Sequence, residues 1–533
     1  MTVTLRPYQA TLKRDIYSAW SAGMRNVLAV AATGSGKTTV FSSVIHDHNG
    51  PCIAIAHRHE LVGQISLALA RNGVRHRIIG QPALIRDCVA SHIEHTGRSY
   101  YNAVAACGVA SVNTLVKMPP TTPWFSTVTL WVQDECHHIL ADNCWGTAAR
   151  LFPNARGLGV TATPVRADGK GLGRHADGLM DTMVFAPSMR DLINDGYLTD
   201  YRIFAPPSDL DLTGVGISAG GDYSPDPLRK AVRQSHIIGD VVQHYLRIAP
   251  GKLGVTFCTD VESASDVAAA FRQAGVPAET VSAKTPAAVR ASILRRFANG
   301  EIKQLTNCDL FSEGFDLPAL EVVSMARPTQ SFGLYSQQFG RALRIMDGKS
   351  HALIIDHVGN VMRHGLPDAA REWSLDRRER KSRGTPDDVI PVRVCPACTG
   401  VYERIVHGLT CPYCGVTATP AGRSLPEQVD GDLYELDADT LTQMRGAIDV
   451  PPASHPDPLI QRSINARHRE RSEAQDSLRA VMSEWAGRRS QATDEDTVRR
   501  LQREFFVTFG IDVLSAQALG RAEAVALTER VRG

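Results

Sequence analysis

Two short stretches of the chain carry side chains that suit phosphate chemistry. The first is AATGSGKTT at residues 31–39, in which the apolar run NVLAVAA leads into a glycine-rich loop. Glycines let backbone N–H groups turn inward around phosphate oxygens, Lys37 adds a cation near the β and γ phosphates, and Thr38 offers a hydroxyl to Mg²⁺. Ala31 replaces the first glycine of the GxxxxGK[ST] pattern. The flanking strand-like and helix-like runs favour a phosphate-binding loop over the alternative, a glycine-rich turn.

The second stretch, VTLWVQDECHH at residues 128–138, is an apolar run that ends in paired acids. Asp134 would hold Mg²⁺ through water, and Glu135 would orient and deprotonate an attacking water. Two adjacent acids after a strand also occur as ordinary surface residues. The phosphate loop upstream favours the catalytic interpretation.

A third group of residues suits a metal ion. Residues 395–415, CPACTGVYERIVHGLTCPYCG, contain two CxxC pairs separated by twelve residues. Four thiolates so placed suit tetrahedral Zn²⁺, whereas a redox CxxC would be a single pair near a βαβ unit. The spacing predicts a structural zinc ribbon that either binds DNA or stabilises the C-terminal part of the chain. The expected ligands are Cys395, Cys398, Cys411 and Cys414.

Length and composition limit the kind of protein that holds these groups. The chain has 533 residues, too many for one hydrophobic core, and its 43% apolar and 21% charged residues exclude a mostly disordered protein. The formal net charge of +2 gives no overall field that would indicate a nucleic-acid partner, so any such surface must be local. No apolar run suits a bilayer and the start lacks a signal-peptide core, so we expect a cytoplasmic protein without a membrane partner.

Two similar series of elements must position the phosphate-binding groups. Short apolar runs alternate with helix-like segments from residue 26 to about 165, and again from about residue 236. This alternation predicts an α/β protein with two parallel sheets wrapped by helices. Between the series, LTGVGISAGGDYSPDP has the composition of a linker or loop.

The C-terminal part of the chain has a helical pattern. Helical segments are expected around residues 459–487 and 513–531. In the first of these, four apolar residues recur at helical spacing and predict a core stripe: Leu478, Val481, Met482 and Trp485.

Seven short motifs together resemble those of superfamily 2 helicases and translocases, in the order expected for that family. The resemblance covers residues 5 to about 360, and its motifs are LRPYQ (5–9), AATGSGKTT, AHRHELVGQ (56–64), DECH (134–137), TATP (161–164), SEGFDLPAL (312–320) and QQFGRALR (337–344). It implies an ATP hydrolase, with ATP and Mg²⁺ bound between two tandem RecA-like domains. The expected domains are a first RecA-like domain at 1–200, a linker at 201–235, a second RecA-like domain at 236–370, a zinc ribbon at 390–416 and a helical domain at 425–533.

The resemblance assigns roles around ATP. Gln9 is similar to the residue whose amide reads adenine, and Gly314 and Asp316 are similar to a loop that contacts the ribose and the nucleic-acid backbone. Three residues of QQFGRALR recur three or four apart and would share one helix face, with two of them acting as arginine fingers. The expected catalytic residues are Lys37, Asp134, Glu135, Arg341 and Arg344. The expected ATP-binding residues are Arg6, Gln9, Thr33, Gly34, Ser35, Gly36, Lys37, Thr38, Thr39, Gly314, Asp316 and Gln337, with Thr38 and Asp134 at Mg²⁺.

The resemblance also assigns contacts to nucleic acid. Polar side chains that follow several strands suit phosphate oxygens, which carry affinity without sequence information. These are Arg58, Gln64, Ser111, Thr114 and Thr259. Residues similar to those that couple the ATP state to nucleic-acid grip are His137, Thr161 and Thr163, for which ordinary polar contacts between strand ends are the alternative.

The expected activity is that of a DNA helicase or translocase without sequence preference. DNA is favoured because VTATPVRADGKGLG is similar to the corresponding stretch of double-stranded DNA translocases, phage helicases and restriction-enzyme motor subunits. A motor subunit of a restriction or defence system, an RNA helicase, and an ATP-binding switch with little turnover are the alternatives. A replication, repair or restriction protein is an expected partner.

Overall fold

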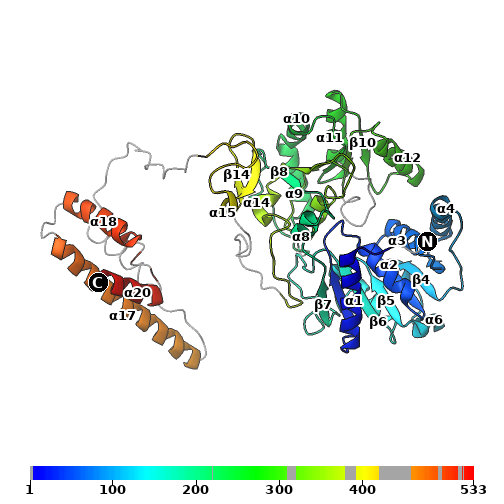
Figure 1. Cartoon of the computed structure of the whole chain (residues 1–533), viewed down its shortest axis with the longest axis horizontal. Helices are drawn as coiled ribbons and strands as arrows, with labels where there is room; N and C mark the ends of the chain where they lie inside the picture. The colour runs from blue at the N-terminus through cyan, green and yellow to red at the C-terminus, as the bar shows by residue number, and fades with distance from the viewer. Residues whose placement is uncertain are drawn as a thin grey trace. The chain divides into compact units, whose positions relative to one another are not determined.

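The structure is a computed structural model, and its chain divides into two compact units, Met1–Arg423 and Ser424–Gly533 (Figure 1). The first unit contains two β-sheets, each the centre of one lobe, and the second unit is helical. The residues that the structure describes are 4–218, 220–308, 320–377, 392–418, 458–489, 495–513, 516, 519 and 521–532.

The first lobe is built on a seven-stranded parallel sheet with the order β3-β4-β2-β5-β6-β1-β7. Most of its strands are buried along their whole length, which explains why they read as continuous apolar runs. The strands are β1 (Asn26–Val30), β2 (Cys52–Ala56), β3 (His76–Ile79), β4 (Cys107–Ser111), β5 (Leu130–Gln133), β6 (Arg156–Thr161) and β7 (Thr182–Phe185). The helices are α1 (Pro7–Ser21), α2 (Lys37–Asp47), α3 (His59–Arg71), α4 (Pro82–Thr96), α5 (Val112–Leu115), α6 (Pro123–Thr127), η1 (Cys136–His138) and α7 (Cys144–Arg150), whereas the next helix, α8 (Met189–Asn194), packs into the core of the second lobe.

The second lobe is built on an eight-stranded sheet with the order β10-β11-β9-β12-β13-β8-β15-β14. Its first six strands are parallel, and β15 and β14 join antiparallel at the end. The strands are β8 (Tyr201–Phe204), β9 (Gly254–Phe257), β10 (Ala278–Val281), β11 (Gln304–Asn307), β12 (Val322–Met325), β13 (Ala352–Asp356), β14 (Val392–Val394) and β15 (Gly400–Glu403). The helices are α9 (Pro225–Gln234), α10 (Ile237–Ile248), α11 (Val261–Gln273), α12 (Ala287–Ala298), α13 (Phe332–Gly340), α14 (Asn360–His364) and α15 (Arg404–His407).

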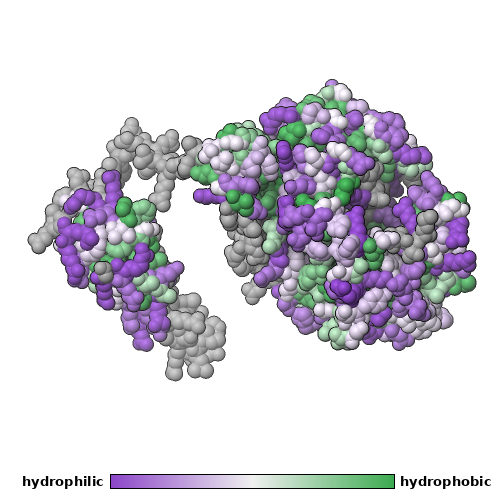
Figure 2. Space-filling view, in the orientation of Figure 1, coloured by the Kyte–Doolittle hydropathy of each residue, from purple (hydrophilic) through white to green (hydrophobic). Residues whose placement is uncertain are grey.

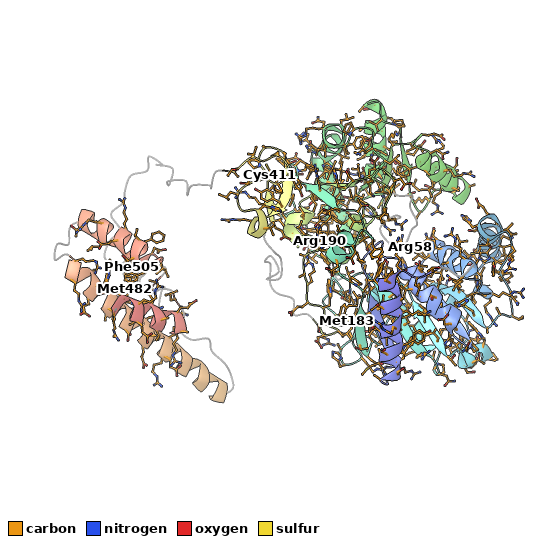
Figure 3. All side chains as sticks on the ribbon, in the orientation of Figure 1. Arg58, Met183, Arg190, Cys411, Met482 and Phe505 are labelled. Atoms are coloured by element: carbon orange, nitrogen blue, oxygen red, sulfur yellow. The ribbon has the colours of Figure 1, made fainter. Side chains whose placement is uncertain are left out.

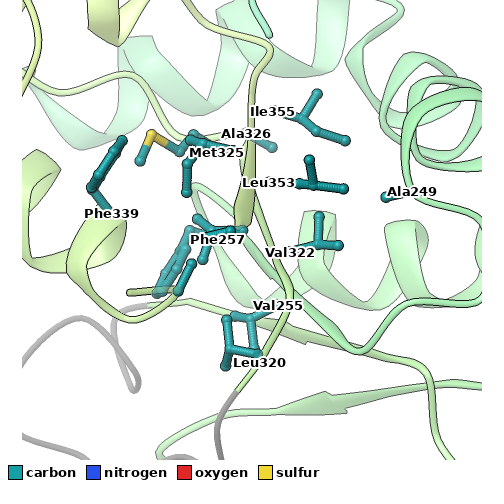
Figure 4. Close-up of a cluster of buried hydrophobic side chains, with 14 of the residues drawn as sticks. Ala249, Val255, Phe257, Leu320, Val322, Met325, Ala326, Phe339, Leu353 and Ile355 are labelled. Atoms are coloured by element: carbon teal, nitrogen blue, oxygen red, sulfur yellow. The ribbon is translucent and has the colours of Figure 1, made fainter. Parts of the chain in front are cut away.

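Apolar side chains from the central strands of the second lobe form its core. Val255 and Phe257 of β9 lie beside Val322 and Met325 of β12, and Phe339 of α13 packs into the same cluster (Figure 4). With the first sheet, this core confirms the predicted α/β fold of two parallel-sheet lobes.

The structure differs from the expected linker at residues 201–235. Strand β8 pairs with β13 inside the second sheet, and the range also contains α9. The Gly- and Asp-rich stretch is held in place as well, because the Asp222 carboxylate accepts hydrogen bonds from Gln330 N (2.6 Å) and Thr329 Oγ1 (3.0 Å). The glycine and aspartate residues of this stretch therefore form turns and do not mark a flexible linker.

The described residues of the second unit form the helices α17 (Pro458–Arg489), α18 (Glu495–Phe509) and α20 (Arg521–Arg532). The four residues of the predicted stripe on α17 are buried in one cluster with Phe505 and Leu527, and Met482 lies beside Phe505 in Figure 3. Helix α18 lies between the two expected helical segments and was not predicted. Its core residues Leu501, Phe505 and Phe509 recur four apart, a helical spacing that the sequence does contain.

Hydrophilic residues cover much of the visible surface of both units, with hydrophobic ones dispersed among them (Figure 2). None of the described helices combines the length and apolar character that a bilayer crossing requires.

A buried polar cluster joins α3, β3 and α4 of the first lobe. Ser66 Oγ lies 2.7 Å from His76 Nε2 and 2.9 Å from His92 Nε2. His76 Nδ1 donates to Val74 O (2.9 Å), and His92 Nδ1 accepts from Tyr100 N (3.3 Å). All four of these hydrogen bonds can form when both imidazole rings are neutral. Burial lowers the pKa of His76 to about 4, which keeps its ring neutral at pH 7.

The buried histidine makes the stability of the first lobe sensitive to acid. Between pH 6.5 and 4 the unfolded chain binds a proton at His76 that the folded lobe does not, so stability is lost as the pH falls through this range. From pH 7 to pH 5 we expect this residue to lower the free energy of unfolding by about 2 kcal/mol. Urea unfolding at both pH values measures this, and His76→Asn should flatten the pH dependence. His95→Asn, at the exposed end of α4, is the control. The prediction is contradicted if the free energy of unfolding of His76→Asn depends on pH as strongly as that of wild type and of this control.

Candidate active site

The phosphate loop connects β1 to α2, which begins at Lys37. Gly34 and Gly36 have φ angles of 87° and 84°, in the left-handed region that glycine adopts without strain. A Cβ at Gly36 would also lie 2.6 Å from Gln9 Nε2. Lys37 Nζ reaches back to Ala31 O at 3.4 Å. The loop amides and the lysine thus lie on one side of a pocket, as phosphate binding requires.

The paired acids follow the carboxyl end of β5. Asp134 accepts a hydrogen bond from Glu135 N at 2.9 Å, and both acids are buried. Glu135 has a φ of 48°, and in the described part of the chain only Thr399 shares a left-handed backbone among non-glycine residues. Such strained conformations cost free energy and concentrate at functional sites.

The second lobe reaches this site through α13. Gln337 Nε2 donates to Glu135 Oε2 at 3.1 Å, which joins the two lobes. One turn later Gly340 lies against the phosphate loop, where a Cβ would come 2.4 Å from the Thr33 Cβ. Only glycine permits so close an approach.

The two arginines do not lie on one face of a continuous helix with Gln337, as the spacing had predicted. Helix α13 ends at Gly340, Arg341 is its C-cap, and Arg344 lies in the turns that follow. The two arginines and Gln337 nevertheless line the same pocket as Lys37 and Glu135. The predicted helix therefore ends before Arg344, and the turns after Gly340 bring the Arg344 guanidinium to the pocket.

The pocket between the lobes has a volume of about 550 Å³. Two buried polar atoms that face it, Thr33 Oγ1 and Gln337 Oε1, have no hydrogen-bond partner among the described residues. Cationic, acidic and unsatisfied polar groups in one cleft fit a nucleotide triphosphate with its metal. The predicted residues that line it are Arg6, Thr33, Gly34, Gly36, Lys37, Thr38, Thr39, Asp134, Glu135, Gln337, Arg341 and Arg344. Gly314 and Asp316 lie outside the described residues.

Two of the predicted ATP-binding residues lie behind the loop. Gln9 Nε2 donates to Ser35 O (2.9 Å), and Gln9 Oε1 accepts from Arg6 N (3.0 Å). The Gln9 amide thus braces the phosphate loop, and neither Gln9 nor Ser35 lines the pocket. The pocket instead contains an aromatic residue that the sequence analysis missed, Tyr197, which lies in no recognised motif.

The predicted nucleic-acid residues fall in different places. Arg58, which is labelled in Figure 3, is one of three arginines that line a second cleft between the lobes. This cleft has a volume of about 270 Å³, and the other two arginines are Arg166 and Arg327. Ser111 caps α5 and contacts Thr114 Oγ1 at 2.9 Å.

Thr259 is buried just beyond the end of β9. Gln64, another of the predicted nucleic-acid residues, lines the nucleotide pocket with Arg71 and Asn72. The face of α3 that carries Gln64 and Arg71 points toward that pocket. The order of the motifs along the sequence gives no information about the direction of this helix face.

The predicted coupling residues form one chain of contacts. His137 Nδ1 lies 3.1 Å from Thr161 Oγ1 and 3.5 Å from Glu135 Oε2. Thr161 Oγ1 in turn donates to Thr163 O at 3.1 Å. Thr163 lies beside Gly333 of α13, where a Cβ would come 3.0 Å from its hydroxyl. The acid pair is therefore connected to the second lobe by a second route.

The four cysteines form a cluster that could hold a metal ion. Their Sγ atoms all lie within 4.8 Å of one another, and the Cys395–Cys414 and Cys398–Cys411 pairs are 3.6 Å apart. Thiolates about 2.3 Å from a tetrahedral metal would be about 3.8 Å apart. Burial acts to raise the pKa of Cys395, but hydrogen bonds from the backbone of Cys398 and Ala397 bring it down to about 7, whereas burial raises the pKa of Cys398 to about 12. The support for a metal therefore comes from the spacing of the four sulfur atoms. The cluster therefore fits a thiolate-bound metal.

The cysteine ribbon continues the second sheet. Strand β15 pairs with both β14 and β8, so the ribbon forms the end of that sheet. Tyr413, within the second CxxC pair, packs on Phe204 of β8 and donates to Val401 O at 3.1 Å. The ribbon is thus part of the second lobe.

Removing the metal is expected to lower the melting temperature of the second lobe by several degrees, because the ribbon covers the β8 edge of its sheet. Thermal unfolding with and without a chelator measures this, and Cys411→Ser should reproduce the chelated profile. Cys144→Ser, outside the cluster, is the matched control. An unchanged melting profile after verified metal loss would contradict the prediction.

Comparisons with known proteins agree with this arrangement. Residues 2–166 match the family model "Type III restriction enzyme, res subunit", and residues 238–346 match "Helicase conserved C-terminal domain". The "51.5 kDa protein" of Lactococcus phage (isolate 7-9) is 31% identical over 388 residues, which cover 72% of this chain and 76% of the relative.

More distant relatives share the same region. The "Putative ATP-dependent helicase IRC3" of Saccharomyces cerevisiae is 27% identical over 376 residues, covering 67% of this chain and 51% of the yeast protein. The chain thus spans about half the length of that relative. A solved fragment of "a putative HsdR subunit of a type I restriction enzyme from Vibrio vulnificus YJ016" has a TM-score of 0.50 at 21% identity, covering 68% of this chain and 66% of that one. The fold of the two lobes is therefore shared with that structure.

Proposed function

The chain belongs to superfamily 2 of helicases and translocases, and from that premise we propose that it hydrolyses ATP to move along, unwind or remodel DNA without sequence preference. The observation that carries this proposal is the convergence of Lys37 and Glu135 of one lobe with Arg341 and Arg344 of the other on one pocket. A site divided between two lobes makes hydrolysis depend on their closure, and opening after hydrolysis then shifts the contacts to the strand.

Each side of the pocket has a part in the reaction. The loop amides and Lys37 hold the β and γ phosphates, and Glu135 takes a proton from the attacking water. The guanidinium groups of Arg341 and Arg344 stabilise charge that develops on the phosphoryl oxygens. Thr38 and Asp134 would hold Mg²⁺, whose charge would neutralise part of that of the phosphates. The contact between Gln337 and Glu135 orients the base only when the lobes are together.

DNA is the proposed polymer. Support comes from the family model named for a type III restriction enzyme, since restriction enzymes act on DNA. Arg58, Ser111, Thr114 and Thr259 supply contacts to phosphate oxygens, which explains the expected lack of sequence preference. The same family model favours a second candidate, the motor subunit of a restriction or defence system, with cleavage supplied by a partner protein.

Zinc is the proposed metal of the cysteine ribbon. Four thiolates at tetrahedral spacing favour Zn²⁺, and a site with four protein ligands has no open position for substrate. Its role in this proposal is structural. Metal analysis of the purified protein, with one equivalent of zinc expected and none in Cys395→Ser, tests it.

Polymer-dependent ATP hydrolysis tests the proposed function. ATPase activity is measured with single-stranded, duplex and forked DNA and with RNA at matched nucleotide concentration. Stimulation by DNA above RNA is the expected result. Greater stimulation by RNA would favour an RNA helicase, and bound ATP with no stimulated turnover would favour a nucleotide switch. A strand-displacement assay on the forked DNA then separates unwinding from movement alone.

A further inference from the structure

Tyr197 lies in the nucleotide pocket without a role in the proposed hydrolysis. It is half-buried and lines the cleft together with Arg6, Gly36 and Lys37. The Arg6 guanidinium carbon lies over the Tyr197 ring, 5.2 Å from its centroid. An aromatic ring and a planar cation therefore form one wall of a pocket whose other walls suit phosphates.

The position of this wall relative to the phosphate loop is fixed by direct contacts. The Tyr197 ring packs on Tyr8, with centroids 4.8 Å apart, and Tyr8 Oη donates to Ser35 O of the loop at 2.7 Å. The next residue, Leu198, lies beside Gly34, where a Cβ would come 3.1 Å from its Cδ2. Movement of Tyr197 away from the loop would break these contacts.

The same segment is also attached to the arginines of the second lobe. Tyr197 N and Leu198 N both donate to Leu192 O of α8, at 2.8 and 3.0 Å. Thr199 N donates to Leu343 O at 2.8 Å, and its hydroxyl donates to Arg344 O at 3.3 Å. Residues 197–199 thus touch the phosphate loop on one side and the arginine segment on the other.

The wall formed by Tyr197 and Arg6 can bind a base by stacking. A purine has two flat π-faces, and aromatic rings and guanidinium planes bind such faces without distinguishing one base from another. The amide of Gln9 bonds Ser35 O, Arg6 N and Tyr8 Oη (3.5 Å), and Gln9 does not line the pocket. Tyr197 and Arg6, which do line it, can offer their flat faces to a base.

We propose that Tyr197 is a base-binding residue, against which, with Arg6, the purine ring of ATP stacks. This inference rests on the proposed ATP site and deepens it, because it assigns base affinity to Tyr197 and leaves triphosphate affinity to the loop and Lys37. Since residues 197–199 contact the arginine segment, base binding also stabilises the arrangement that closes the lobes.

Nucleotide titrations of the full-length chain test the inference. Binding of the imido analogue of ATP, the imido analogue of GTP and inorganic tripolyphosphate is measured by calorimetry. Tyr197→Ala should weaken both nucleotides about tenfold, whereas tripolyphosphate, which has no base, should bind as in wild type. Tyr197→Phe keeps the ring and should behave as wild type. Tyr17→Ala, a half-buried tyrosine of α1 outside the pocket, is the matched control.

Two results would overturn the inference. One is an unchanged nucleotide affinity in Tyr197→Ala, and the other is an equal loss for nucleotides and tripolyphosphate, which would mean that the ring only supports the fold. Failure of the proposed function is separate, because it would appear as wild-type binding of both analogues without polymer-stimulated ATP turnover. In that case the difference between nucleotide and tripolyphosphate affinity still decides the role of Tyr197.

Discussion

Arg341→Ala is expected to lower kcat for ATP hydrolysis by roughly a thousandfold or more, the range that arginine fingers supply to phosphoryl transfer. The Arg341 side chain is buried at the pocket and comes from the lobe opposite the phosphate loop. Its charge acts on the transition state more than on bound ATP, so KM should change little. Steady-state kinetics with saturating DNA measure both constants.

Matched variants separate this effect from general damage to the second lobe. Arg341→Lys keeps the charge but loses the planar fork, so it should recover only part of the activity. Arg344→Ala should cost less, because Arg344 is more exposed than Arg341. Arg296→Ala, a surface residue of α12 paired with Glu279, is the control and should retain activity. If Arg341→Ala keeps kcat within a few-fold of wild type, the second lobe does not complete the site.

Glu135→Gln is expected to lower kcat by roughly a hundred- to ten-thousandfold, as loss of a general base does. The amide has the same shape, but it cannot take a proton from water. Nucleotide affinity should remain because Lys37 and the loop amides are intact. Single-turnover hydrolysis together with analogue binding measures the two effects.

The outcome for Glu135 also identifies the base. Glu94→Gln, on the exposed side of α4, provides the control for an ordinary acid. Lys37→Ala should abolish turnover too, but through weaker phosphate binding, so the two variants differ in the analogue titration. Substantial turnover by Glu135→Gln would move the base to another group, for which Asp134 is the nearest acid.

The sequence predicted the features that local patterns determine. Continuous apolar runs predicted the parallel strands, and two glycines before Lys37 predicted the loop, because the backbone there needs a left-handed conformation. Cysteine spacing predicted the metal ligands for a similar reason, since each CxxC pair lies in one turn. Each of these signals is contained within about twenty residues.

Features that depend on distant packing were missed. Nothing in the residues of β8 or β15 indicates that the cysteine ribbon completes the second sheet, because that pairing joins strands about 200 residues apart. Tyr197 and Gln64 enter the pocket through the tertiary positions of a turn and a helix face. Motif order gave no sign that Gln64 lines the nucleotide pocket, and it left Tyr197 unmarked.

The ribbon at the end of the second sheet has a consequence for handling the molecule. An uncovered strand edge is a template for pairing with other chains. With β15 released, the unpaired side of β8 would present such an edge, flanked by the apolar Tyr201 and Ile203. Chelating or oxidising buffers are therefore expected to promote self-association of the chain. Purification under reducing conditions without a chelator should then increase the yield of active protein.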